Sequence, residues 1–93
     1  MKGRLETEFS DEFDELVEET LKFFDPKIPN KELRKKPIFK KLNEGQVNVV
    51  ISAAYAKKIY GTGKEGWDEY DANRRFYINY CIIREKEEAN KRN

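Results

Sequence analysis

Histidine is absent from this 93-residue chain, and cysteine occurs once, at Cys81. Without histidine, the chain lacks the commonest general base and the commonest metal ligand. With a single cysteine it cannot form an internal disulfide, and ordinary zinc sites and Cys–His or Ser–His nucleophile pairs are excluded. We therefore expect a non-enzymatic protein with no catalytic residue, no metal and no cofactor.

Long apolar runs are also lacking. No stretch approaches the roughly 18 apolar residues of a membrane helix, and the opening sequence MKGRLE contains no apolar segment typical of a signal peptide. We therefore expect a cytoplasmic protein with no membrane partner. A small chain rich in Lys, Glu, Asn and Tyr suits a microbial or viral accessory factor, an interpretation that rests on base rates alone.

Charged residues make up 40% of the chain, which is polar for a globular protein, yet aromatic residues reach 13% and recur at regular spacings. Disorder is therefore not expected. A chain of this length forms one domain with a modest core. We predict a single helical domain over residues 1–93, with frayed ends at 1–8 and 91–93.

Helical periodicity predicts an all-α fold, a small bundle of three to four helices. The first helix is expected over 10–25, with Ser10 as its N-cap and Pro26 just beyond its end. The second is expected over 31–42, capped by Asn30 and broken at Pro37. The apolar stripe expected on the first helix is Phe13, Leu16, Val17, Thr20, Leu21 and Phe24.

A third helix is expected over 44–60. Asn43 and Gln46 have the spacing of a capping box, and Gly61 suits the position after the last turn. Residues 47–51 are β-branched enough for a strand, but the apolar spacing of three and four favours a helix. The apolar residues at this spacing are Val47, Val50, Ile51, Ala54, Tyr55 and Ile59.

The last helix, expected over 66–90, is long and carries two apolar stripes on opposite faces. A surface helix needs only one such stripe. The second must be covered by another part of the chain, such as residues 38–42, by a second copy, or by a different partner. The first stripe is Trp67, Tyr70, Tyr77, Ile78, Cys81 and Ile82, and the second is Phe76, Tyr80 and Ile83.

The second stripe predicts a protein–protein interaction module. Such an adaptor or inhibitor-like factor would occupy the surface of another protein or join two copies of itself. Aromatic and arginine side chains are common interface anchors. The expected interface residues are Asn73, Phe76, Tyr80, Ile83 and Arg84.

Charge is unevenly distributed along the chain. Residues 1–25 have a net charge of −6, residues 26–64 of +8 and residues 65–93 of −1. The basic segment could contact phosphates, which makes a nucleic-acid-binding regulator the alternative function. The other interpretations are pairing with the acidic first helix and simple solvation. The candidate phosphate contacts are Lys31, Arg34, Lys35, Lys36, Lys40 and Lys41.

Other candidate sites are weak. Residues 61–64 (GTGK) superficially resemble a phosphate loop, but the upstream glycine, the following Ser or Thr and the preceding strand are missing, so we expect a turn between helices. Carboxylates at helical spacing are expected to be solvated. Arg74 faces the first stripe and is expected to reach a carboxylate, and Cys81 is expected to be a core thiol. No stretch carries a motif specific enough to indicate a family.

Overall fold

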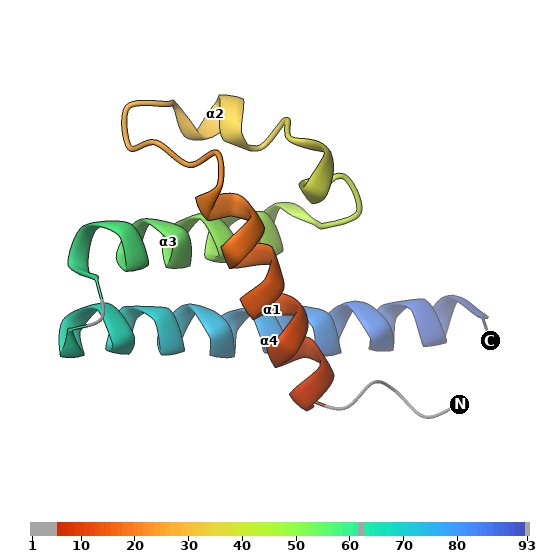
Figure 1. Ribbon diagram of the computed structural model, residues 1–93. Helices are drawn as coiled ribbons and strands as arrows, with labels where there is room; N and C mark the ends of the chain where they lie inside the picture. Colours follow the sequence, from red (N-terminus) through yellow and green to blue (C-terminus); the bar gives the residue numbers. More distant parts are fainter. Residues whose placement is uncertain (1–5, 62, 93) are drawn as a thin grey trace.

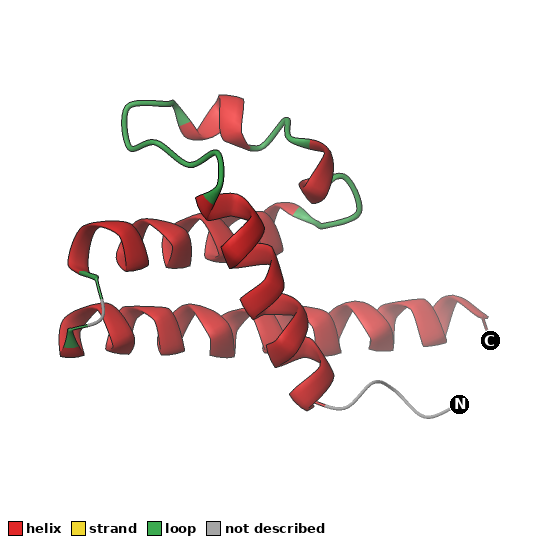
Figure 2. Cartoon of the chain, viewed as in Figure 1, coloured by secondary structure: helices red, strands yellow, loops and turns green. Residues whose placement is uncertain are grey.

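The computed structural model describes residues 6–61 and 63–92, and within them every regular element is helical (Figure 2). The prediction of an all-α fold with a long C-terminal helix is confirmed. Helices α3 and α4 lie side by side as an antiparallel hairpin, and α1 crosses it on one side (Figure 1). The elements are α1 (Glu6–Leu21), α2 (Asn30–Leu33), the 3₁₀ helix η1 (Pro37–Phe39), α3 (Glu44–Tyr60) and α4 (Lys64–Arg92).

Local sequence signals define both ends of α3. The Asn43 side chain accepts a hydrogen bond from the backbone N–H of Gln46 (2.8 Å), and the Gln46 side chain accepts one from the N–H of Asn43 (2.9 Å). This is the predicted capping box. At the other end, Gly61 has φ of 66°, a conformation that favours glycine. The GTGK segment is therefore a turn between helices, as expected, although Thr62 lies outside the described residues.

The core lies between α1 and the α3–α4 hairpin. Phe13 of α1 is fully buried, and its ring lies 5.3 Å from the rings of both Tyr70 and Tyr77 of α4. Val50 is fully buried on the facing side of α3. The predicted α1 stripe is confirmed as the core-facing side: Phe13, Val17, Thr20 and Phe24 are buried, and Leu16 and Leu21 are partly buried.

The predicted bounds of α1 are wrong at both ends. The helix begins at Glu6 rather than after Ser10, because Phe9 continues the core stripe one turn earlier and is only 2% exposed. Residues 6–8 therefore belong to α1, and residues 1–5 lie outside the described part of the chain; the fraying expected for 1–8 stays a prediction. The helix ends at Leu21, four residues before the predicted end at residue 25. Just after Leu21, the backbone N–H groups of Lys22 and Phe23 bond to carbonyls three residues earlier, so the chain continues as a 3₁₀ turn.

Residues 25–42, here called the strap, connect α1 to α3 and run along α3 on the side away from α4 (Figure 1). The predicted 31–42 helix is reduced to one turn of α2 and to η1. The break at Pro37 is confirmed, since Pro37 begins η1, but Asn30 is the first residue of α2 rather than its cap. Leu33 and Phe39 are buried and fix the strap to the core.

Helix α4 extends two residues beyond the predicted 66–90 range at each end. It begins at Lys64 and includes residues 91 and 92, while residue 93 lies outside the described part of the chain; the fraying expected for 91–93 stays a prediction. Of the helices in the described part of the chain, none is both long and apolar enough to cross a membrane.

Candidate interaction surface

The first stripe of α4 faces the core. Tyr70, Tyr77 and Cys81 are buried, and Ile78 and Ile82 are partly buried against the core. The exception within the predicted stripe is Trp67, which is 52% exposed although its ring packs edge-on against Tyr70 at 5.9 Å.

The second stripe, here called the outer stripe, consists of Phe76, Tyr80 and Ile83, which are 53%, 37% and 53% exposed. The strap does not cover it, because Ile38 and Leu42 of the strap pack against the core instead. The outer stripe therefore remains an exposed apolar surface of the single chain. One of the three coverings that the sequence left open, burial by residues 38–42, is excluded.

The Tyr80 ring packs against Gly45 at the start of α3. A Cβ placed on Gly45 would lie 3.0 Å from two carbon atoms of the Tyr80 ring. The ring therefore lies against bare backbone at the start of α3, and this contact limits the movement of Tyr80. The packed ring offers a partner apolar area at small entropy cost.

The two polar residues of the expected interface, Asn73 and Arg84, make contacts within the chain. Arg84 donates hydrogen bonds to the Lys41 carbonyl (2.6 Å) and to Gln46 Oε1 (3.1 Å). Asn73 donates to the Glu69 carbonyl one turn earlier (2.9 Å). Arg84 thus joins α4 to the end of the strap and to the start of α3, a structural role that the sequence did not indicate.

Buried polar groups link α4 to α1 and α3. Gln46 Nε2 lies 3.2 Å from the sulfur of buried Cys81, so the expected core thiol is confirmed. The Tyr77 hydroxyl donates to Glu12 of α1. Burial, together with this hydrogen bond, raises the pKa of Tyr77 well above its usual value.

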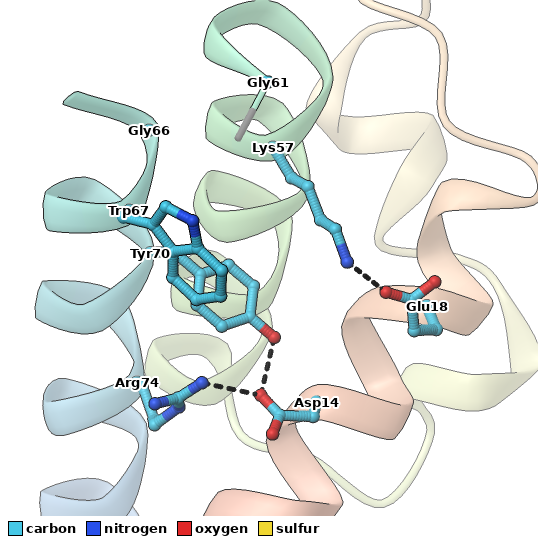
Figure 3. Close-up of a pocket in the computed structure, with 8 residues that line it drawn as sticks. All are labelled: Asp14, Glu18, Lys57, Gly61, Gly66, Trp67, Tyr70 and Arg74. Carbon is cyan, nitrogen blue, oxygen red and sulfur yellow. Dashed lines mark hydrogen bonds and ion pairs between the residues drawn. The ribbon is translucent and has the colours of Figure 1, made fainter. Parts of the chain in front are cut away.

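A pocket of about 360 Å³ lies where α1 meets the turn of the hairpin (Figure 3). Asp14 accepts hydrogen bonds from the Tyr70 hydroxyl (2.6 Å) and from Arg74 (3.2 Å), as expected for Arg74. Glu18 pairs with Lys57 across the same pocket. The two carboxylates that line the pocket are thus each paired with one of its two cationic side chains. The lining residues are Asp14, Glu18, Lys57, Gly61, Gly66, Trp67, Tyr70 and Arg74.

The basic segment of the strap is only partly paired, and by close acidic neighbours. Arg34 lies 3.5 Å from Glu44, and Lys35 lies 3.6 Å from Glu32. Lys36 lies over the Phe23 ring at 5.1 Å. Of the α1 ion pairs described above, Glu18–Lys57 joins the acidic first helix to the basic middle of the chain, residues 26–64, in line with the predicted pairing, whereas Asp14 pairs with Arg74 of α4. Lys31, Lys40 and Lys41 are exposed.

The remaining candidates form no reactive cluster. Asp71 pairs with Arg74 at 3.1 Å, and Asp68 is exposed. In the part of the chain that the structure describes, no group of three or more potential ligands could hold a metal ion.

Comparison with known proteins adds no relative. No family model matches the chain, no curated protein matches it, and no solved structure matches it.

Proposed function

We propose that this protein is a small, non-catalytic protein–protein interaction module that binds its partner through the outer stripe of α4. The observation that carries the proposal is the exposure of Phe76, Tyr80 and Ile83 as neighbours on one helix face. A contiguous apolar patch on a small domain is typical of an interaction site. Its mechanism is the occupation of a surface on another polypeptide.

The position of the patch supports this proposal. It lies on a flank of α4, turned away from the buried Tyr70 and Tyr77, and its three side chains are exposed, so a partner can reach it without disturbing the core. The stripe is carried by a continuous helix of 29 residues, which is a rigid support for a binding surface.

Site-specific photo-cross-linking in the producing cells tests the proposal. A photoreactive amino acid replaces Phe76 or Ile83 in separate variants, and Ile59 serves as the matched control because it is also apolar and 48% exposed, but on α3. We expect polypeptide adducts from positions 76 and 83 and none from position 59. Equal labelling from all three positions, or no adduct from 76 and 83, contradicts the proposal.

A second candidate function is binding of nucleic acid through the strap. The supporting observation is that Lys31, Lys35, Lys36, Lys40 and Lys41 are all exposed within one short segment. Such a segment would bind phosphates mainly by charge. Lys40 and Lys41 also line a shallow hollow with Arg84 and Lys91, although Glu87 and Glu88 share it.

A further inference from the structure

We propose that the partner of the outer stripe is a second copy of this chain, packed α4 against α4 in an antiparallel arrangement. This inference rests on the proposed function and names its partner. The two-fold axis lies beside residue 78, so that each copy covers the outer stripe of the other.

The length of α4 supports this arrangement. At about 1.5 Å per residue, its 29 residues span about 43 Å, against about 25 Å for the 17 residues of α3. Because Gly45 at the start of α3 lies against Tyr80, the last third of α4 projects past α3 (Figure 1). Residues 86–91 of this projection are all exposed.

Exposed helix ends fray unless something packs against them. In the antiparallel dimer the projecting end of each α4 lies along the first half of the other α4. The same contact therefore covers the outer stripe and supports the projection. Because two-fold symmetry makes the contact self-complementary, the assembly closes at two copies and does not extend into a filament.

Charge distinguishes the antiparallel from the parallel arrangement. Beside the outer stripe, the first half of α4 carries three exposed acids, Glu65, Asp68 and Glu69. The projecting end carries Lys86 and Lys91, with Glu87 as the one acid on this side. A parallel pair places the three acids of one copy beside those of the other, which is unfavourable. An antiparallel pair brings a net charge of −3 beside one of +1.

The side chains also match in size in this register. With the axis beside residue 78, Phe76 meets Tyr80 of the second copy, and Ile83 packs between the small Ala72 and Asn73. Asp68 lies on the same flank as Lys86 of the second copy, and the two differ in height along the helices by about 3 Å, which the long lysine side chain can span. The two-fold axis repeats each of these contacts.

Light scattering on a sizing column, from micromolar to near-millimolar protein, tests the inference. We expect a mass approaching twice the 11.1 kDa of the chain as concentration rises. Phe76→Ser or Ile83→Ser should leave a monomer, whereas the control Ile59→Ser should still dimerise. Circular dichroism verifies that each variant remains helical.

A charge exchange tests the antiparallel direction. Asp68→Lys alone and Lys86→Asp alone should each weaken the dimer roughly tenfold, because an exposed pair repeated by symmetry turns repulsive. The double variant should restore the dimer. A stripe-dependent dimer that the double variant does not restore overturns the antiparallel arrangement.

The two proposals fail differently. A monomer at all concentrations, with adducts from position 83 to a different protein, overturns the second-copy inference and leaves the proposed function standing. The absence of any adduct from positions 76 and 83 overturns both. An adduct of twice the chain mass, together with a concentration-dependent dimer, supports both.

Discussion

Gly66 at the start of α4 lies backbone to backbone against Gly61 at the end of α3: a Cβ on Gly66 would lie 2.6 Å from the Gly61 carbonyl oxygen. Real side chains do not approach a backbone oxygen this closely, and the backbone cannot move aside as a side chain can. The contact therefore sets how closely the two helices of the hairpin approach at the turn.

Gly66→Ala should destabilise the fold by about 1–3 kcal/mol, because the added methyl group forces the helices apart. Gly63→Ala is the matched control in the same turn, since its Cβ would lie 3.7 Å from the Tyr60 carbonyl, an ordinary contact. Urea unfolding followed by circular dichroism measures both. Equal stability of the two variants contradicts this account of the turn.

Alkaline pH should unfold the protein through its buried tyrosines. Burial and hydrogen bonds to Asp14 and Glu12 raise the pKa values of Tyr70 and Tyr77 above the usual 10.0. The native state therefore keeps protons that the unfolded state releases above about pH 10, so the free energy of unfolding should fall by up to about 1.4 kcal/mol per pH unit for each tyrosine.

Tyr77→Phe separates the contribution of Tyr77 to this alkaline loss of stability from that of Tyr70. The variant should show a shallower loss of stability above pH 10 than the wild type, while Tyr60→Phe, an exposed control, should not. Denaturant unfolding at a series of pH values from neutral to strongly alkaline provides the measurement. If the free energy of unfolding falls equally steeply with pH above 10 in the wild type and in Tyr77→Phe, folding does not raise the pKa of Tyr77.

Core and outer-stripe aromatics should differ sharply in their contribution to stability. Phe13→Ala should cost about 3–5 kcal/mol, because the ring is fully buried against Tyr70 and Tyr77. Phe76→Ala combined with Tyr80→Ala should cost less, about 1–2 kcal/mol, since Phe76 is 53% exposed and Tyr80, although packed against Gly45, is 37% exposed. The same double change should abolish binding through the outer stripe. A large loss of stability in the double variant would assign the stripe to the fold rather than to a partner.

For the second candidate function, charge reversal of the strap is the test. Lys35→Glu, Lys36→Glu and Lys40→Glu together should abolish retention on immobilised nucleic acid, and wild-type retention should weaken steeply with salt. The double alanine change at Phe76 and Tyr80 should leave this retention unchanged. Retention that survives the charge reversal rules out the strap as a phosphate-binding segment.

The sequence predicted features that depend on neighbouring residues. The capping box of Asn43 and Gln46, the glycine at position 61 and the break at Pro37 are local signals, and the structure confirms all three. The core side of α1 was also predictable, because periodicity alone identifies the apolar face of a helix.

Features set by distant parts of the chain were not predictable. The true start of α1 depends on the burial of Phe9 in the core, which no local cap signals. Likewise, the exposure of the outer stripe depends on where the strap packs, and the contact of Tyr80 with Gly45 joins residues far apart in sequence. The sequence showed that a second stripe exists, but only the packing shows that it is uncovered.

The burial of Cys81 makes the chain convenient for chemical labelling. It is the only thiol in the sequence, it is 4% exposed, and it lies against Gln46 in the core. A maleimide or nitroxide reagent should therefore react with the folded protein at an introduced surface cysteine, leaving the native thiol untouched. Probes can thus be placed on either helix of the hairpin without first replacing Cys81.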